Sequence, residues 1–308
     1  MQLFYTDVFV LPLPPGHRFP MAKYAMLREA LIASGDFSPA DFLLPAAASD
    51  AELARAHDPA YIRAVSCGQL PEKAQKAIGF PWSLEMVERS RRSAGATLAA
   101  CRSALASGGF AANLAGGTHH AFRDRGEGFC VFNDAAVAAL AVLAEGLAAR
   151  VLILDLDVHQ GNGTAAILRD EARVFTFSMH GARNYPFDKE ISDLDVELPD
   201  GCDDAHYLAQ LDAHLDTALD LAHPDLVIYL AGADPYQDDR LGRLGLSMAG
   251  LAERDRRVFS ACRARRLPVA IAMAGGYARQ IEDTVRIHTT TLQLARALAP
   301  TSSPQTSA

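Results

Sequence analysis

The sequence predicts an α/β fold with three layers, helix, sheet and helix, around a mainly parallel central sheet. Three observations support this class. Short aliphatic segments alternate along the chain with amphipathic segments of helical length. Residues 151–154 are four consecutive aliphatics, as expected of a strand buried on both faces. Glycines and polar residues follow several of these segments, and the carboxyl edge of an open parallel sheet is where such proteins place their sites.

Strands are expected at residues 2–6, from 113 into the turn at 116–117, and at 151–155, 174–179, 226–230 and 269–273. Helices are expected at 21–33, from 59 onward, and at 84–107, 134–149, 164–169, 203–221, 247–265 and 280–298. Asp58 and Pro59 indicate a helix start, because Asp caps free N–H groups and Pro fits the first turn. No linker, repeat or composition shift divides the chain. We therefore predict one domain over residues 1–300 and a disordered tail over 301–308.

Charge and cysteine content exclude several classes of protein. The chain has 29 basic and 37 acidic residues among 308, a net charge of −8, and no block of like charge. Direct nucleic-acid binding is not expected, because it needs a concentrated basic face. The five cysteines are scattered and odd in number, which favours a reducing compartment. With no leader-like or membrane-spanning segment, we expect a soluble cytoplasmic protein.

The segment that follows the 151–155 strand carries the strongest chemical signal. Asp155, Asp157 and His159 occupy alternate positions, and alternate side chains of an extended chain leave on one face. Carboxylate oxygens and imidazole nitrogens each bind zinc at about 2 Å. The alternative is a polar strand end that caps the next helix.

Three further segments repeat the arrangement of strand, glycine and reactive side chain. They are residues 116–120, 232–234 and 275–277, which with residues 155–159 make four such segments. Each alone is weak: a His pair is more often structural, a lone Asp usually caps a helix, and a Tyr after two glycines usually packs at an edge. Parallel strands, however, bring all four ends to one edge of the sheet.

These residues together predict metal-assisted hydrolysis of an amide. The expected metal ligands are Asp157, His159 and Asp234, a three-residue set that leaves a coordination position open. His119 and His120 are candidates for general base and acid. Tyr277 is placed to donate a hydrogen bond to a developing oxyanion.

The same motifs, taken jointly, resemble the histone deacetylase superfamily over about residues 3–290. The matching segments are Gly-Gly-Thr-His-His-Ala-Phe at 116–122, Gly-Phe-Cys-Val-Phe-Asn at 128–133, Asp-Leu-Asp-Val-His-Gln-Gly-Asn-Gly at 155–163, Gly-Ala-Asp-Pro at 232–235 and Gly-Gly-Tyr at 275–277. The sequence of residues 157–163, with Ser178-Met-His180 and Tyr185-Pro186, looks most like that of the class IV group and its bacterial relatives. The resemblance implies an arginase/deacetylase-like fold.

The resemblance also implies roles for individual residues. Zinc, one ion per chain, would be held by Asp157, His159 and Asp234. His120 would activate water and protonate the leaving amine. His119, with Asp155 as its carboxylate partner, would orient the water, and Tyr277 would clamp the carbonyl oxygen.

Two further sites follow from the resemblance. Gly128 and Phe129 match one wall of a narrow tunnel for an acyl-lysine side chain, and Tyr185 approaches the opposite wall. A structural monovalent cation, K⁺, would be bound partly through backbone oxygens. Its matching residues are Asp155, Asp157, His159, Ser178 and Met179.

One position departs from the class I pattern. Asn162 stands where class I members have an Asp behind the second histidine, whereas class II and class IV members share the Asn. An amide oxygen can accept the imidazole N–H but carries no charge, so it raises the pKa of His120 less than a carboxylate would. The position after the zinc histidine is Gln160 rather than a second His, again as in class IV.

The sequence supports an acyl-lysine deacylase first, acting on a protein or peptide. An acetylpolyamine or other small-molecule amidohydrolase would use the same site. An arginase-like two-manganese enzyme needs more carboxylates, but Pro235 and Tyr236 follow Asp234. A non-catalytic binding module would show loss of chemical residues, and no such loss is visible. The preferred acyl group, the physiological partner and the oligomeric state stay open.

Overall fold

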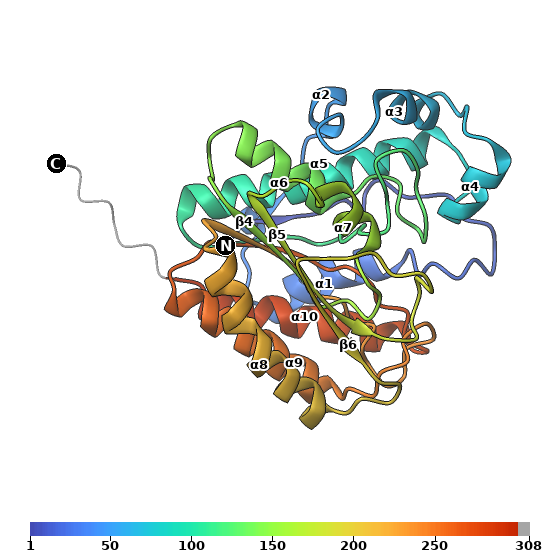
Figure 1. Ribbon diagram of the computed structural model, residues 1–308. Helices are drawn as coiled ribbons and strands as arrows, with labels where there is room; N and C mark the ends of the chain where they lie inside the picture. Colours follow the sequence, from blue (N-terminus) through green and yellow to red (C-terminus); the bar gives the residue numbers. More distant parts are fainter. Residues whose placement is uncertain (301–308) are drawn as a thin grey trace.

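A computed structural model describes residues 1–300 and contains one sheet of eight strands between two layers of helices (Figure 1). The strands are β1 (Leu3–Phe4), β2 (Phe42–Leu43), β3 (Phe110–Asn113), β4 (Val151–Asp155), β5 (Val174–Gly181), β6 (Leu194–Leu198), β7 (Leu226–Leu230) and β8 (Val269–Ala272). Their order in the sheet is β2-β1-β3-β8-β7-β4-β5-β6. Each pair of neighbouring strands in this described sheet is parallel, so the sheet is wholly rather than mainly parallel.

The described residues also contain ten α-helices. They are α1 (Lys23–Ser34), α2 (Asp50–Leu53), α3 (Pro59–Ser66), α4 (Glu72–Ile78), α5 (Leu84–Ser107), α6 (Asp134–Ala144), α7 (Asn162–Leu168), α8 (Asp204–Ala222), α9 (Met248–Ala264) and α10 (Ile281–Leu298). A short 3₁₀ helix, η1, covers Pro39–Asp41. The α3 start is as predicted, with the Asp58 carboxylate accepting the backbone N–H of Ala60 at 2.7 Å.

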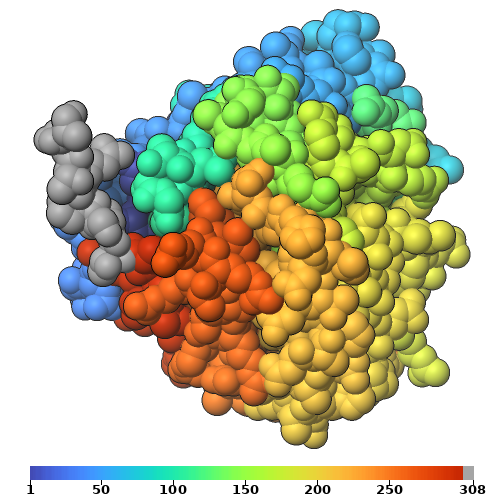
Figure 2. All heavy atoms as spheres, turned by 60° about the vertical axis from the view of Figure 1, so that its left-hand side comes forward, coloured from blue at the N-terminus to red at the C-terminus, as the bar shows by residue number. Residues whose placement is uncertain are grey.

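Alternating residues of the central strands face two separate cores. In β4, Leu152 and Leu154 pack in one core with α8 and α9, whereas Val151 and Ile153 pack in the other with α5 and α6. Figure 1 shows α1, α8, α9 and α10 on one face of the sheet and the remaining helices on the other. In Figure 2, α8 and α9 lie side by side as gold and orange bands on the surface.

The strand order determines where the site forms. Strands β3, β8, β7 and β4 are consecutive neighbours, and each is followed by one of the four polar segments. Since all four run parallel, their carboxyl ends open on the same edge of the sheet. This confirms the three-layer α/β architecture, and it brings the four polar segments to the same edge of the sheet.

Several predicted elements differ from the observed ones. The strand expected to start at 113 ends there instead. The helix expected over 134–149 stops at Ala144, where Gly146 turns the backbone with a φ of 68°. Five short elements were not expected, namely η1, α2, α4, β2 and β6. Strand β6 alternates Leu194-Asp-Val-Glu-Leu at the sheet edge, a mixed pattern without the long apolar run of the central strands.

Three other expectations can be compared with the structure. All five cysteines are free thiols. No helix of the described chain has both the length and the apolar character needed to span a bilayer. The disordered tail predicted at 301–308 lies outside the described residues.

Candidate active site

The backbone bends directly after β4, and this bend distributes the polar side chains. Strand β4 ends at Asp155, and residues 157–159 turn rather than continue as an extended strand. The Asp155 carboxylate accepts the N–H of Asp157 at 3.1 Å, and the Asp157 carboxylate accepts the N–H of His159 at 2.9 Å. The prediction that all three side chains leave one face of an extended chain is therefore wrong in its geometry. They nevertheless share one buried site.

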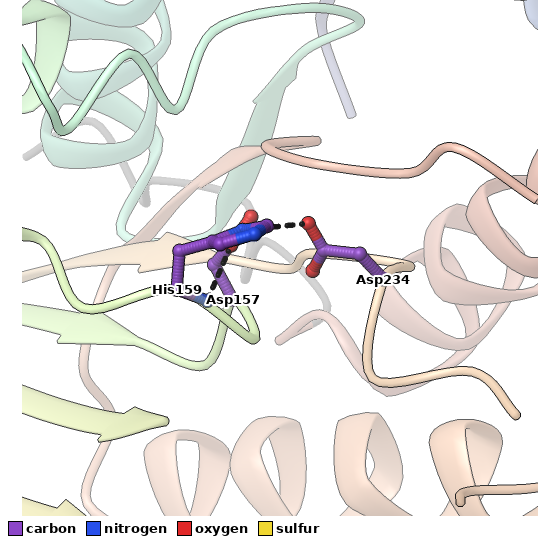
Figure 3. A group of neighbouring side chains, drawn as sticks. All are labelled: Asp157, His159 and Asp234. Carbon is purple, nitrogen blue, oxygen red and sulfur yellow. Dashed lines mark hydrogen bonds and ion pairs between the residues drawn. The ribbon is translucent and has the colours of Figure 1, made fainter. Parts of the chain in front are cut away.

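Asp157, His159 and Asp234 form a group that could hold a metal ion (Figure 3). One ligand atom from each lies within 4.8 Å of the others. His159 Nδ1 lies 3.0 Å from Asp157 Oδ1 and 3.4 Å from Asp234 Oδ2. All three side chains are buried, and burial with the adjacent Asp157 carboxylate raises the pKa of Asp234 to about 7. A concentration of buried negative charge of this kind favours a bound cation.

Two local features fit the metal assignment. Asp234 Oδ2 is fully buried, yet it has no hydrogen-bond partner within the described structure. Gly275 provides the space beside it, since a Cβ there would collide with Asp234 Oδ2 and would lie 2.6 Å from Asp157 Oδ2. The Gly275 N–H also donates to Asp157 Oδ2 at 2.7 Å. The loop after β8 therefore holds the Asp157 carboxylate and leaves space for Asp234 Oδ2 as a free acceptor.

The two histidines after β3 have different partners and different electrostatic environments. His119 Nδ1 lies 2.6 Å from Asp155 Oδ2, and His120 Nδ1 lies 2.7 Å from Asn162 Oδ1. Burial would lower the pKa of His119, but the carboxylates of Asp155 and Asp157 outweigh it and raise this pKa to about 9. Burial and the adjacent His119 lower the pKa of His120 well below its ordinary value. One histidine therefore favours the charged form and the other the neutral form.

Tyr277 is positioned through its backbone. Its N–H donates to Asp239 Oδ2 at 2.6 Å, and its carbonyl accepts from Arg240 Nε at 3.3 Å. Lys23, at the start of α1, places its ammonium 5.3 Å from the centre of the Tyr277 ring. Burial raises the pKa of the Tyr277 phenol well above its ordinary value, so the phenol keeps its proton.

A cavity of about 720 Å³ joins these groups to the surface. Its lining includes the predicted catalytic and tunnel residues His119, His120, Asp157, His159, Asp234, Tyr277, Gly128, Phe129 and Tyr185. The Tyr185 ring stands edge-on to His120 at 4.9 Å, and the Phe129 ring lies 6.1 Å from that of Tyr277. The Tyr185 hydroxyl donates to Glu127 at 2.6 Å, which fixes this wall. Phe129 has a φ of 68°, a strained conformation of the kind that recurs at functional sites.

The remaining predicted residues lie behind the cavity. Asp155 and Asn162 do not line it but hold the two histidines that do. Strands β4 and β5 pair Asp155 with Ser178, so Ser178 and Met179 lie beside the bend that follows β4. Both are buried, and the Ser178 hydroxyl contacts His180 Nδ1 at 2.9 Å. The structure thus brings the five residues of the predicted cation site into one region.

Three supporting residues were missed by the sequence analysis. Asp134 accepts hydrogen bonds from the backbone of Gly117 and Thr118, which directly precede His119. Asp239 and Lys23 hold the loop that carries Tyr277. The sequence shows an Asp at a helix start at position 134 and another before Arg-Leu-Gly at position 239. It does not show what they bind, because some of their hydrogen-bond partners are distant in sequence. Lys23 gave no signal, since a lysine at a helix start is usually exposed.

Fold and site together define an α/β protein with a buried side-chain group able to hold a metal ion, open to a cavity lined by histidines and aromatic rings. The histone deacetylase domain matches residues 17–292. The chain therefore belongs to the histone deacetylase family and is a hydrolase of that family, as the motifs predicted.

Two relatives show how far the similarity extends. An uncharacterized protein of Picosynechococcus sp. is 46% identical over 292 residues, covering 95% of this chain and 97% of that protein. Histone deacetylase 2 of Arabidopsis thaliana is 32% identical over 293 residues, covering 91% of this chain and 75% of the plant protein. The similarity thus spans nearly the whole chain.

Two solved structures share the fold. A histone deacetylase homologue from Aquifex aeolicus superimposes with a TM-score of 0.82 at 24% identity, covering 96% of this chain and 83% of that chain. An acetylpolyamine aminohydrolase from Burkholderia pseudomallei superimposes with a TM-score of 0.76 at 24% identity, covering 97% and 99%. At this identity the likeness concerns the fold alone.

Proposed function

We propose that the protein hydrolyses the amide of an Nε-acyl-lysine in a protein or peptide, with zinc as its metal and with a class IV-like arrangement of residues. The observation that carries the proposal is the lining of one cavity. The Asp157–His159–Asp234 group, both histidines and Tyr277 all face it, and Phe129 and Tyr185 flank it. Aromatic walls suit the four-carbon stem of a lysine, which is apolar until its amide nitrogen.

Zn²⁺ held by Asp157, His159 and Asp234 would polarise the amide carbonyl and lower the pKa of a water. The remaining roles belong to this chain's own groups. The Nδ1–H of His120 donates to Asn162, which leaves Nε2 available to accept a proton. Because its pKa is lowered by burial, His120 is neutral and can take a proton from water and later give it to the leaving amine.

His119 and Tyr277 complete the proposed mechanism. The Asp155 carboxylate accepts the Nδ1–H of His119 and stabilises its charged form, so His119 can orient water and offset negative charge. The Tyr277 phenol, protonated at neutral pH, can donate a hydrogen bond to the carbonyl oxygen. We also propose a structural K⁺ at Asp155, Asp157, His159, Ser178 and Met179, which the pairing of Asp155 with Ser178 across β4 and β5 supports.

One experiment tests the metal and the substrate together. The purified protein is analysed for bound metal, and rates are measured on acetyl-, long-acyl- and lactyl-lysine peptides beside acetylated polyamines. We expect bound zinc, turnover of at least one acyl-lysine peptide, and loss of turnover after chelation that zinc restores. Undiminished turnover after complete metal removal would refute the zinc assignment. Turnover of acetylated polyamines alone would refute the acyl-lysine assignment.

Tyr277→Phe tests the proposed oxyanion contact. Removing one donor to a developing oxyanion lowers kcat by about 100- to 1,000-fold in comparable sites. The backbone bond from Tyr277 to Asp239 does not depend on the hydroxyl, so folding and zinc content should be preserved. The measurements are kcat, metal content and the melting temperature. A variant with parental kcat would contradict the role assigned to Tyr277.

A further inference from the structure

The outer part of the cavity is lined by basic side chains from four separate segments of the chain. They are Arg18 before α1, Lys76 in α4, Arg183 after β5, and Arg240 and Arg243 after β7. All five are exposed, and the side chain of Arg183 is 78% accessible. Side chains from segments so distant in sequence line one opening only because the fold brings them there.

Carboxylates are distributed differently around the same cavity. Among the described lining residues, only Asp157 and Asp234 carry carboxylates, and both are buried in the metal group. The polarity of the cavity therefore changes along its length, with acidic side chains at the buried end and basic side chains toward solvent.

Neighbouring carboxylates offset the basic mouth only in part. Glu72 lies 2.6 Å from Lys76, and Asp200 lies 2.7 Å from Arg243 and 3.9 Å from Arg183. Within the described chain, Arg18 and Arg240 have no carboxylate in ion-pair contact. Glu127, behind the tunnel wall, is itself paired with Arg125 at 2.7 Å. The five cations and their two partner carboxylates thus leave an excess of three positive charges.

This excess is opposite in sign to the whole molecule, whose net charge is −8. A local field of opposite sign at a site entrance attracts ligands of complementary charge and raises their association rate. An apolar contact lies beside it, because Phe187 lines the same cavity with 84% of its surface exposed. The mouth therefore combines positive charge with an aromatic contact surface.

We propose that the preferred substrate is an acyl-lysine flanked by acidic residues in a protein segment. This inference rests on the proposed deacylase function and specifies its substrate class. The acyl-lysine enters between Phe129 and Tyr185, while carboxylates on neighbouring substrate residues contact the basic mouth. A cationic polyamine would meet repulsion at the same place.

A peptide panel on the wild-type, zinc-loaded enzyme tests the inference. Three peptides carry the same acyl-lysine in one sequence and differ only in flanking Asp/Glu, Gln or Lys residues. With a few exposed charge contacts, we expect kcat/KM to be about tenfold higher for the acidic than for the basic peptide at low salt. The difference should appear mainly in KM and should shrink in about 0.5 M NaCl, where exposed charges are screened.

Charge reversal locates the effect. The double variant Arg18→Glu with Arg183→Glu should bring the acidic and basic peptides to parity or invert their order. Arg240 is unsuitable as a probe, because its guanidinium donates to the carbonyls of Tyr277 and Ala278. The control is Arg263→Glu, an exposed position in the last turn of α9 away from the cavity, which should keep the wild-type preference.

The outcomes separate this inference from the function on which it rests. Equal kcat/KM for the three peptides, or a preference that persists unchanged in high salt, would overturn the proposed substrate class. Neither result would contradict the deacylase function itself. A preference lost equally in the Arg263→Glu control would also overturn it. Absence of turnover on every peptide would overturn both proposals. Faster turnover of an acetylated polyamine than of the acidic peptide would favour the small-molecule alternative.

Discussion

Lys23 is a buried lysine whose ammonium has no carboxylate in ion-pair contact within the described chain. Its Nζ lies 3.3 Å from the carbonyl of Gly276 and 3.5 Å from that of Ala274. The rings of Tyr24 and Tyr277, each with its centre 5.3 Å away, provide further electrostatic stabilisation. Because the two carbonyls belong to the loop that carries Tyr277, Lys23 acts on the site by positioning this loop.

Lys23→Met keeps the length and apolar stem of the side chain but removes the charge. Without the ammonium, the loop over 274–277 loses its anchor, and displacement of a catalytic group by about 1 Å can lower the rate by up to about 100-fold. We expect kcat to fall by about 10- to 100-fold with little change in KM. Lys73→Met, at an exposed position in α4, is the matched control. Equal kcat for the two variants would show that Lys23 does not position the loop.

At the scale of elements, the start of helix α6 supports the loop that carries His119 and His120. Asp134 in its first turn is fully buried and accepts from Thr97 Oγ1 at 2.5 Å, the Gly117 N–H at 2.9 Å and the Thr118 N–H at 2.7 Å. Asn133, the residue before it, caps the same helix by accepting the N–H of Ala136 at 3.0 Å. The start of α6 and the loop before His119 are thus one hydrogen-bonded unit.

Asp134→Asn should weaken this unit without removing much volume. An amide replaces one acceptor oxygen with a donor and removes the charge, so at least one buried N–H or hydroxyl loses its partner. We expect a loss of about 2 to 4 kcal/mol in the free energy of unfolding, together with a lower kcat. Urea unfolding and steady-state rates measure the two effects.

Asp216→Asn provides the comparison for Asp134. Asp216 is an exposed residue of α8, whose carboxylate contacts Arg265 at 2.9 Å. An exposed ion pair contributes about 1 kcal/mol or less, so this variant should unfold almost as the parent does. If the two variants lost the same stability, the buried network around Asp134 would not stabilise the loop.

The elements show which parts of the protein a sequence can predict. Strand β4 and its motif were predictable, because burial on both faces leaves an uninterrupted apolar run. The bend over 157–159 was not, since side-chain to backbone hydrogen bonds replace the extended conformation there. The contacts of Asp134, Asp239 and Lys23 depend on segments that meet only in the folded chain. The polar residues that line the cavity were therefore predictable, whereas the residues that hold them in place were not.

At the scale of the whole molecule, buried neutral histidines link the fold to pH. Burial lowers the pKa of His57 to about 4 and that of His288 well below its ordinary value. The neutral form of His57 is required by its contacts. Its Nδ1–H donates to the carbonyl of Phe122 at 2.9 Å, and its Nε2 accepts the N–H of Asn133 at 2.9 Å. Protonation at Nε2 would break the second bond beside α6.

This linkage predicts how stability changes in acid. An unfolded histidine binds a proton near pH 6.5, whereas folded His57 binds one only near pH 4. Between these values the His57 ring binds a proton in the unfolded chain but not in the folded one, so its contribution to the free energy of unfolding should fall as the pH falls from about 6.5. His57 alone should contribute about 3 kcal/mol over this window, at up to about 1.4 kcal/mol per pH unit. Asp234, whose pKa is raised to about 7 in the folded chain, titrates in the same window with the opposite sign, so the contribution of His57 has to be isolated by comparison with a variant.

His57→Gln removes the titrating group while keeping a side chain that can donate and accept. Urea unfolding at several pH values between 5 and 6.5 gives the change of the free energy of unfolding with pH. In the variant this change should be less steep than in the parent, by an amount that corresponds to about one proton. The variant's lower stability at neutral pH does not enter this comparison, because the slope and not the absolute value is measured. Parallel slopes in parent and variant would mean that His57 is protonated in the folded state as readily as in the unfolded chain. Acid sensitivity would then have to arise at other groups.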